Sequence, residues 1–120
     1  MPETEVILFA EADGSCPFID WLDGLVPKVQ DKCIVRVERL AERGYELRRP
    51  EADYLRDNIY ELRASHRGIH YRILYFFYGR TAVISHGLIK EKEVPSREIE
   101  LTIKRRSMYA MDPEKHTYRE

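Results

Sequence analysis

The sequence predicts an α+β domain in which an antiparallel sheet packs against a helical hairpin and a C-terminal helix. Two changes of pattern support this prediction. Apolar residues recur every three or four positions between residues 17 and 43, whereas residues 58–89 follow the two-residue alternation of strands. Pro95 then precedes a second stretch with helical spacing. The expected order of elements is therefore β-α-α-β-β-β-α.

Two helices are expected between residues 17 and 43. The first begins near Pro17, since proline is tolerated in the first turn of a helix, and Gly24 and Pro27 end it. The second runs from about Pro27 to Arg43 and is followed by Gly44, a residue type that commonly follows the last turn. Each helix carries one apolar stripe at helical spacing. The stripes consist of Phe18, Trp21, Leu22 and Leu25 in the first helix and of Val29, Cys33, Val37 and Leu40 in the second.

The strands are expected on both sides of this hairpin. A short apolar run at residues 6–9 indicates a strand that joins the sheet, and the polar residues 45–54, with Pro50, indicate a connecting loop. Three further strands, separated by tight turns, are expected at residues 58–64, 70–77 and 81–89. The middle one is apolar on both faces beyond Arg72, which predicts a covered, central position.

The elements follow one another closely, without repeats or a long linker. We therefore expect residues 1–111 to form a single domain that ends with a helix from Pro95 to about Met108. Residues 112–120 are polar and are expected to form a tail that frays.

The composition favours a folded, cytoplasmic protein. Hydrophobic residues make up 43% and charged residues 34% of the chain, which argues against disorder. The apolar runs are too short to span a bilayer, and the acidic N-terminal segment does not resemble a secretory signal. Cys16 and Cys33 lack the spacing of a redox or metal pair, so both are expected to be core residues in a reducing compartment.

Charge is distributed unevenly along the chain, although the formal net charge is only -1 and the sequence pI ≈ 6.4. Residues 1–54 hold 7 basic and 12 acidic side chains, whereas residues 55–111 hold 11 basic and 6 acidic side chains. The second segment can therefore attract a polyanion such as nucleic acid. The alternative is that these charges are solvated faces of strands and a helix, and composition alone favours that alternative.

No common catalytic motif occurs in the sequence. It lacks a phosphate-binding loop, a nucleophile elbow, a zinc-protease motif and a dinucleotide-binding glycine pattern. The spacing of the four histidines gives little support to a metal site, so we expect none. A cationic and aromatic set on and after the predicted strands stands out instead. Its members are Tyr60, Arg63, Arg67, Tyr71, Arg72, His86, Lys90 and Lys92.

Such residues suit RNA chemistry, but each also has an ordinary structural explanation. Arginine binds phosphate through a planar set of donors, and tyrosine and histidine stack on unpaired bases. Equally, Arg63 can pair with a neighbouring carboxylate. Tyr60 and Tyr71 can pack within the sheet, and His86 can be a hydrogen-bonded core residue. Arg72 is the most informative member, because it begins the most apolar strand, where an unpaired cation is costly.

Several short motifs follow one another in an order that is typical of a known family. A YELR run ends at Arg63, a YRILYFF run begins at Tyr71, an HG pair at His86 precedes Lys90, and Pro95 leads the last helix. Over roughly residues 5–109 this order resembles the phage Gp49-like branch of the RelE/ParE toxin superfamily, which includes HigB toxins.

The resemblance implies a RelE-like fold and a toxin held in check by an antitoxin, commonly a helix-turn-helix DNA-binding protein encoded by an adjacent gene. In ribosome-dependent members the toxin enters the ribosomal A site and cleaves the mRNA there. The 2′-hydroxyl of the mRNA attacks the adjacent phosphate, while the protein orients the hydroxyl and stabilises the charge. The resemblance therefore implies a metal-independent endoribonuclease without a cofactor, whose partners are the ribosome, mRNA and an antitoxin, and not a membrane.

The family's site residues can be carried over position by position. The resemblance implies that Arg72, on the central strand, and Arg63, on the strand before it, contact phosphate, and that Lys90 lies near the RNA. These three are the expected catalytic residues. The expected RNA-binding residues are Tyr60, Arg67, Tyr71, His86, Lys92 and Tyr109.

Two features keep other functions open. Glu61 stands where some RelE toxins carry a lysine, so no active-site base is carried over. Many such toxins are clearly basic, whereas this chain is nearly neutral. The alternatives are a ParE-like toxin that inhibits gyrase, and a non-catalytic phage-derived module that only binds an antitoxin or another protein.

Overall fold

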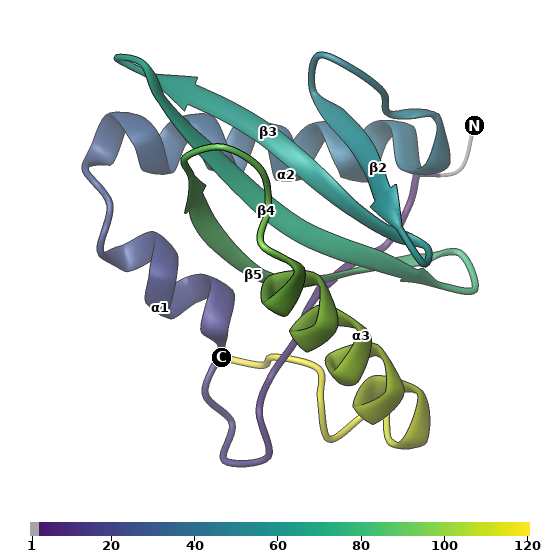
Figure 1. The fold of residues 1–120 in the computed structure, drawn as a ribbon. Helices are drawn as coiled ribbons and strands as arrows, with labels where there is room; N and C mark the ends of the chain where they lie inside the picture. The colour runs from purple at the N-terminus through teal and green to yellow at the C-terminus, as the bar shows by residue number, and fades with distance from the viewer. Residues whose placement is uncertain (1–2) are drawn as a thin grey trace.

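The structure, a computed structural model, describes residues 3–120, which form three α-helices, one short 3-10 helix and five strands (Figure 1). The α+β class predicted from the sequence is confirmed. In chain order the elements are β1 (Val6–Leu8), α1 (Pro17–Asp23), α2 (Pro27–Arg43), η1 (Gly44–Glu46), β2 (Ala52–Arg56), β3 (Ile59–His66), β4 (Ile69–Tyr78), β5 (Thr81–Lys90) and α3 (Ser96–Met111).

The five strands form one mixed sheet in the order β1-β5-β4-β3-β2. Strands β2 to β5 pair antiparallel with their chain neighbours, and β1 joins the sheet parallel to β5. Strand β4 lies in the centre, as the apolar pattern beyond Arg72 predicts. The register places Arg63 of β3 opposite Arg72 of β4, and Arg72 opposite Leu88 of β5.

Helices cover both faces of the sheet. In Figure 1, α2 lies behind the strands and α3 lies in front of them. The apolar stripes of α1 and α2 pack on one face, and α3 packs on the other. The first core includes Leu22, Val29, Leu40, Ile73 and Ile84, and the second includes Phe9, Ile59, Phe76, Val83 and Ile99. No helix within residues 3–120 is long and apolar enough to cross a membrane.

Helix α1 packs directly on β5 because β5 contains Gly87. A Cβ atom at this position would lie 2.2 Å from a ring carbon of Trp21, so only glycine leaves room for the indole. The Trp21 ring also meets the Tyr71 ring edge-on, with their centroids 6.3 Å apart. The glycine of the HG motif therefore has a packing role, and the two predicted core cysteines, Cys16 and Cys33, are buried in the same core.

Strand β2 corrects the prediction that residues 45–54 form a loop. Residues Ala52–Arg56 pair with β3, with a register shift between Tyr54 and Arg56. An edge strand has one neighbour, so polar side chains are tolerated and the apolar alternation is weak. Asp57 and Asn58, both with positive φ, make the turn into β3. Two such residues are typical of the tightest hairpin turns.

The C-terminal segment corrects the prediction of a frayed tail. Thr117 forms a bridge with Phe9, and the Tyr118 backbone N–H donates to the Leu8 carbonyl at 2.8 Å. His116 is buried, and its ring stacks on Phe9 with centroids 5.1 Å apart. Its Nδ1 is hydrogen-bonded to the Ala10 carbonyl at 2.8 Å. Residues after α3 thus cover the outer edge of β1, which explains why a polar segment is ordered.

Candidate functional site

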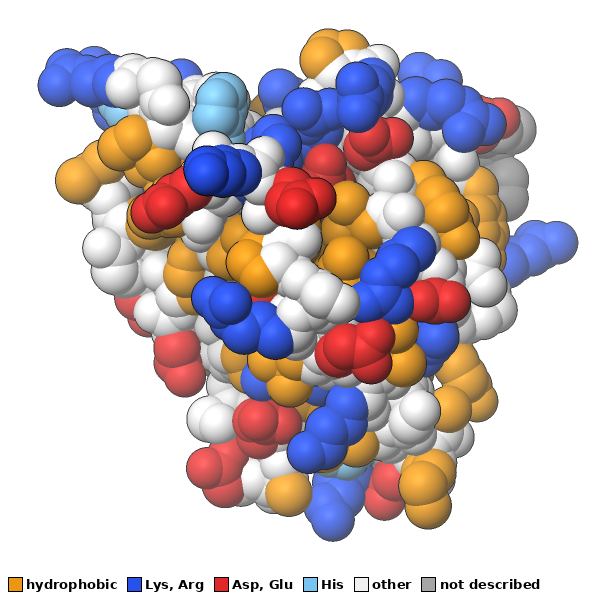
Figure 2. Space-filling model, in the orientation of Figure 1, with side chains coloured by type: hydrophobic (Ala, Val, Ile, Leu, Met, Phe, Trp, Pro, Cys, Tyr) orange, Lys and Arg blue, Asp and Glu red, His pale blue; other side chains and the backbone are white. Residues whose placement is uncertain are grey.

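The sheet face on the side of α3 is the candidate functional face. Helix α3 packs over one end of it, around Ile59, Phe76 and Val83. Alternation along the strands brings Arg63, Arg72 and Lys90 to the same face beyond that end. Arg63 pairs with Arg72, Arg72 pairs with Leu88 of β5, and Lys90 lies two residues after Leu88. Figure 2 shows this side of the molecule, where Lys and Arg side chains gather towards the top of the view with acidic side chains between them.

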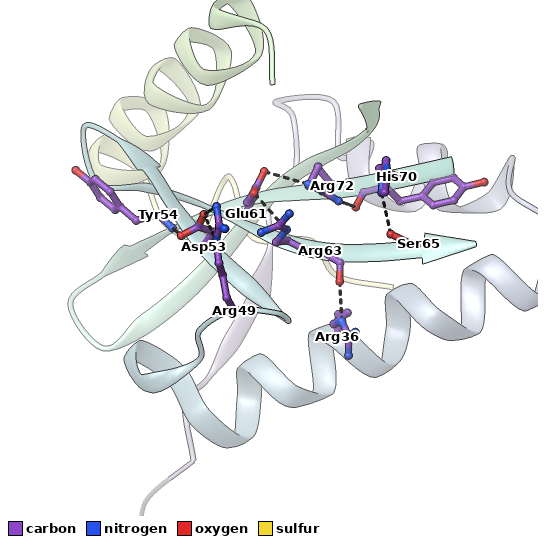
Figure 3. Close-up of polar contacts among 10 residues, drawn as sticks. Arg36, Arg49, Asp53, Tyr54, Glu61, Arg63, Ser65, His70 and Arg72 are labelled. Carbon is purple, nitrogen blue, oxygen red and sulfur yellow. Dashed lines mark hydrogen bonds and ion pairs between the residues drawn. The ribbon is translucent and has the colours of Figure 1, made fainter. Parts of the chain in front are cut away.

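The Glu61 carboxylate contacts both arginines, as the dashed lines in Figure 3 show. Its Oε1 atom is 3.3 Å from Arg72 Nε, and its Oε2 atom is 3.7 Å from Arg63 Nε. The side chains of Glu61 and Arg72 are only 6% and 2% exposed, whereas that of Arg63 is 23% exposed. One carboxylate therefore serves two guanidinium groups, and Arg63 is the member that solvent reaches. We call these three residues the Arg–Glu–Arg cluster.

The buried pair in this cluster is incompletely satisfied. Arg72 Nη1 donates to the Tyr71 carbonyl at 3.0 Å, but neither Arg72 Nε nor Glu61 Oε1 has a hydrogen-bond partner within residues 3–120. Burial raises the pKa of the Glu61 carboxyl, against the opposing effect of the Arg72 charge. Burial also lowers the pKa of Arg72. Buried charges with poor hydrogen bonding lower the stability of a fold, so this pair is a candidate for a functional role.

Neighbouring side chains hold β3 and β2 beside the cluster. Arg36 of α2 donates from Nε to the Arg63 carbonyl at 2.7 Å, which ties the middle of β3 to the helix behind it. On β2, Asp53 is the register partner of Glu61 and forms an ion pair with Arg49, with 2.7 Å between Arg49 Nη2 and Asp53 Oδ2. The Arg63 carbonyl and the Asp53 carboxylate thus have fixed partners, whereas within residues 3–120 the Arg63 guanidinium has only the longer ion-pair contact to Glu61.

Lys90 completes the cationic part of this face. It ends β5 opposite His70, whose Nδ1 is hydrogen-bonded to Ser65 Oγ at 2.9 Å. The Lys90 charge is close enough to oppose the rise in the pKa of Glu61 that burial causes. Lys90 forms no ion pair with a carboxylate within residues 3–120, so its ammonium group is available to an external anion.

The structure separates the expected RNA-binding residues. Arg67 is exposed in the turn between β3 and β4, and Lys92 is exposed between β5 and α3, so both are accessible near this face. Tyr60 and Tyr71 point to the opposite face of the sheet, and Tyr71 is buried against Trp21. Tyr109 is buried against Phe76. These three tyrosines therefore do not contact an anion that binds at the Arg–Glu–Arg cluster.

His86 lies on the α3 side of the sheet but is not open to solvent. Its Nε2 is hydrogen-bonded to Glu98 at 2.8 Å and its Nδ1 to Ser85 at 2.8 Å. Burial lowers the pKa of His86, and the bond to Glu98 opposes that effect. Arg105 of α3 donates to the same Ser85 hydroxyl at 3.3 Å. This network fixes α3 on β5, which makes His86 a residue that positions the helix beside the site.

Three residues beside Arg63 and Arg72 are not among the site residues expected from the sequence: Glu61, Arg49 and Asp53. For Glu61 a signal was present, because the two-residue alternation places it on the face of Ile59 and Arg63, next to a buried arginine on the adjacent strand. For Arg49 and Asp53 no signal was available, since strand β2 was not predicted.

The model of the family described as phage derived protein Gp49-like (DUF891) matches residues 20–107. The matched segment begins in α1, ends in α3 and includes the whole Arg–Glu–Arg cluster and Lys90. None of the curated proteins matches the chain.

Proposed function

The chain belongs to the Gp49-like family of phage-derived proteins, a toxin branch related to HigB and RelE, and from this premise we propose that it cleaves mRNA on the ribosome as the toxin of a toxin–antitoxin pair. The observation that carries the proposal is the Arg–Glu–Arg cluster. Two arginines that face one another on adjacent strands share a single carboxylate, with Lys90 nearby. A phosphodiester of RNA is an anion that such a cationic arrangement binds.

The phosphate contact is assigned first to Arg63 and Lys90, which solvent reaches. The partly exposed Arg63 guanidinium gives planar, two-pronged donation to the non-bridging oxygens. Arg72 lies one strand further in, and its Nε lacks a hydrogen-bond partner within residues 3–120. When a phosphate displaces the Glu61 carboxylate, it becomes the new partner of Arg72. Arg72 then stabilises the negative charge that develops on the phosphate during the reaction.

The reaction proposed is an internal transfer at phosphorus. The 2′-oxygen forms a bond to the adjacent phosphorus as the bond to the 5′-oxygen breaks, which leaves a cyclic phosphate on one fragment and a 5′-hydroxyl on the other. The 2′-hydroxyl loses its proton, and the departing 5′-oxygen gains one. Glu61 is the proposed proton acceptor, because burial raises its pKa towards the range in which a carboxylate serves as a base.

The proposed partners follow from the same premise. A cognate antitoxin, of the helix-turn-helix class that the resemblance implies, covers the toxin until it is released. The chain is nearly neutral and therefore gains little affinity for RNA from its net charge. In the proposed reaction the ribosome holds the mRNA and supplies part of the binding. No cofactor is part of the proposed reaction.

The test is to map the 5′ ends of cellular mRNA after induction of the toxin without its antitoxin. Cuts confined to translated codons are expected for the wild type. Arg63→Gln and Lys90→Gln should each reduce the cleavage rate on isolated ribosome complexes, Arg63→Gln by about a hundredfold. Arg43→Gln, on the exposed end of α2, is the matched control and should cleave normally.

Two results would contradict the proposal. If the wild type inhibits supercoiling by gyrase and leaves mRNA intact, the chain is a ParE-like toxin. If expression without an antitoxin neither slows growth nor cuts mRNA, the chain is a binding module. Circular dichroism of each purified variant separates loss of activity from loss of folding.

A further inference from the structure

A hollow whose lining includes no member of the Arg–Glu–Arg cluster lies among η1, the turn before β3, the end of β4 and α3. It is a cavity of about 350 Å³ lined by Tyr45, Asn58, Tyr60, Phe77 and Arg106. A cavity of this size can enclose a small ligand such as a nucleotide base. We call it the aromatic cavity. Nothing in the proposed cleavage chemistry uses it.

Three aromatic rings form the walls of the aromatic cavity. Tyr45 of η1 stacks on Phe77, with ring centroids 3.8 Å apart, and donates from its hydroxyl to the Gly79 carbonyl at 2.7 Å. Tyr60 meets Phe77 edge-on with centroids 5.4 Å apart. The rings are therefore held in place before any ligand arrives. Tyr45 nevertheless stays 54% exposed, so it keeps free surface for stacking.

Polar groups stand around these rings. Arg106 of α3 donates from Nη1 to the Asp57 carbonyl at 2.6 Å and forms no ion pair with a carboxylate within residues 3–120. Asn58, in the hairpin turn before β3, is exposed and presents a side-chain amide that can both donate and accept. Arg48 is close enough for its charge to act on the Tyr60 hydroxyl.

The nearby acidic groups are already engaged. Asp57 is paired with Arg56, and Glu46, which follows Tyr45, lies 3.9 Å from Arg43. Among the described residues that line the aromatic cavity, Arg106 is the one with a charged side chain. Exposed, ordered aromatic rings beside an unneutralised arginine are the combination that single-stranded nucleic acids bind, because every base has a face for stacking and every linkage has a phosphate.

We propose that the aromatic cavity binds one unpaired nucleotide of single-stranded RNA. The base stacks on Tyr45 and lies against Tyr60, the Asn58 amide meets the edge of the base, and Arg106 pairs with the phosphate. The proposal rests on the proposed function for its choice of RNA over other ligands. Tyr60, expected from the sequence to bind RNA, takes that role here and not at the Arg–Glu–Arg cluster.

The location of the aromatic cavity separates nucleotide binding there from cleavage at the Arg–Glu–Arg cluster. Tyr60 and Phe77 point to the sheet face opposite to Arg63 and Arg72, so the nucleotide held here is not the one that is cut. The aromatic cavity instead anchors a second RNA segment, either ribosomal or messenger, and thereby orients the toxin. Both sources offer the same chemistry to the cavity.

The test uses a fluorescent hexanucleotide whose 2′-oxygens are methylated, so that it cannot be cut. Tyr45→Leu removes the stacking ring and Arg106→Gln the charge, and each is expected to weaken binding about tenfold by fluorescence anisotropy. Tyr45→Phe keeps the ring and should bind within about twofold of the wild type. Matched controls are Tyr78→Leu, an exposed tyrosine outside the aromatic cavity, and Lys104→Gln on α3.

Each outcome supports or overturns the proposal. Wild-type affinity in both Tyr45→Leu and Arg106→Gln overturns it, as does an equal loss in Tyr45→Phe and Tyr45→Leu. Loss of antitoxin binding with unchanged oligonucleotide affinity assigns the surface to a protein partner and also overturns it. If the wild type fails to cut mRNA but its oligonucleotide affinity depends on Tyr45 and Arg106, the proposed function fails and this site stands. The affinity of the Arg106→Gln variant for vacant ribosomes and for a methylated mRNA fragment, each compared with the wild type, distinguishes a ribosomal from a messenger segment.

Discussion

Glu61 Oε1 lies 3.3 Å from Arg72 Nε in the interior of the sheet, and yet neither atom has a hydrogen-bond partner within residues 3–120. The opposite charges of Glu61 and Arg72 lie close enough to attract one another, but these two atoms do not form a hydrogen bond. Such a pair adds little to stability in comparison with apolar side chains of similar size, although removal of one partner alone is expensive. The pair is thus better explained by a change of partners during function than by the needs of the fold.

A double-mutant cycle measures how strongly the Glu61 and Arg72 side chains depend on one another for stability. Arg72→Met leaves a buried carboxylate, and Glu61→Leu leaves a buried guanidinium, so each single change should lower the free energy of unfolding by about 3–5 kcal/mol. The double variant should recover most of that loss, because no charge remains to be buried. Urea denaturation measures all three, with Arg67→Met in the exposed turn as control. Additive losses in the double variant would show that the two side chains act independently.

The protonation of Glu61 provides a second prediction. Burial raises its pKa above the ordinary value of 4.5. The folded state then holds this proton more tightly than the unfolded state, so the Glu61 contribution to stability is greatest at low pH and declines as pH rises from about 4.5 through the folded pKa. A titration of the side-chain carboxyl by carbon NMR should show the raised value, and Arg72→Met should raise it further by removing the opposing charge. A Glu61 pKa at or below 4.5 would be inconsistent with burial as the dominant cause.

Gly87 offers a test of the packing between α1 and β5. Gly87→Ala places a methyl group against the Trp21 ring and should lower the free energy of unfolding by about 1–3 kcal/mol. Gly24→Ala is a suitable control, since its added Cβ makes only an ordinary 3.5 Å contact. Thermal denaturation of the two variants checks this. A stable Gly87→Ala protein would mean that Trp21 moves aside at little cost.

His86 should make stability depend on pH in the opposite sense to Glu61. Burial lowers the pKa of His86 below 6.5, so the unfolded chain binds a proton more readily than the folded protein. Its contribution to stability is therefore present above pH 6.5 and decreases as pH falls below that value. The difference in unfolding free energy between the wild type and His86→Gln should shrink between pH 7 and pH 5.5. A difference that stays constant over this range would exclude His86 as its source.

The fold was largely predictable because most of its elements have a regular apolar pattern. Helix α2 was found with its bounds, since Val29, Cys33 and Leu40 are all buried on one stripe. Strand β2 was missed because an edge strand imposes little pattern on its residues. The docking of His116 was missed because its partner, Phe9, lies at the other end of the chain, and no local pattern reports such a contact.

The candidate site was predictable in part for a related reason. The sequence pattern put Arg63 and Arg72 on adjacent predicted strands, and the register of the sheet pairs these two residues. The fate of the tyrosines was not predictable, because alternation does not say which face a helix covers. Tyr71 and Tyr109 turned out to be core residues on opposite sides of the sheet.

Because residues after α3 dock onto β1, strand β1 finds all of its partners only late in the synthesis of the chain. Strand β1 leaves the ribosome first, but it pairs with β5 and with residues near His116, which is 106 positions from its partner Ala10. Contacts over such separations form late in folding, whereas α1 and α2 need only near neighbours. A nascent chain whose translation has not gone beyond α3 therefore has a β1 strand with an uncovered outer edge. The outer edge of β1 is therefore covered only after translation has passed α3 and reached the residues around His116.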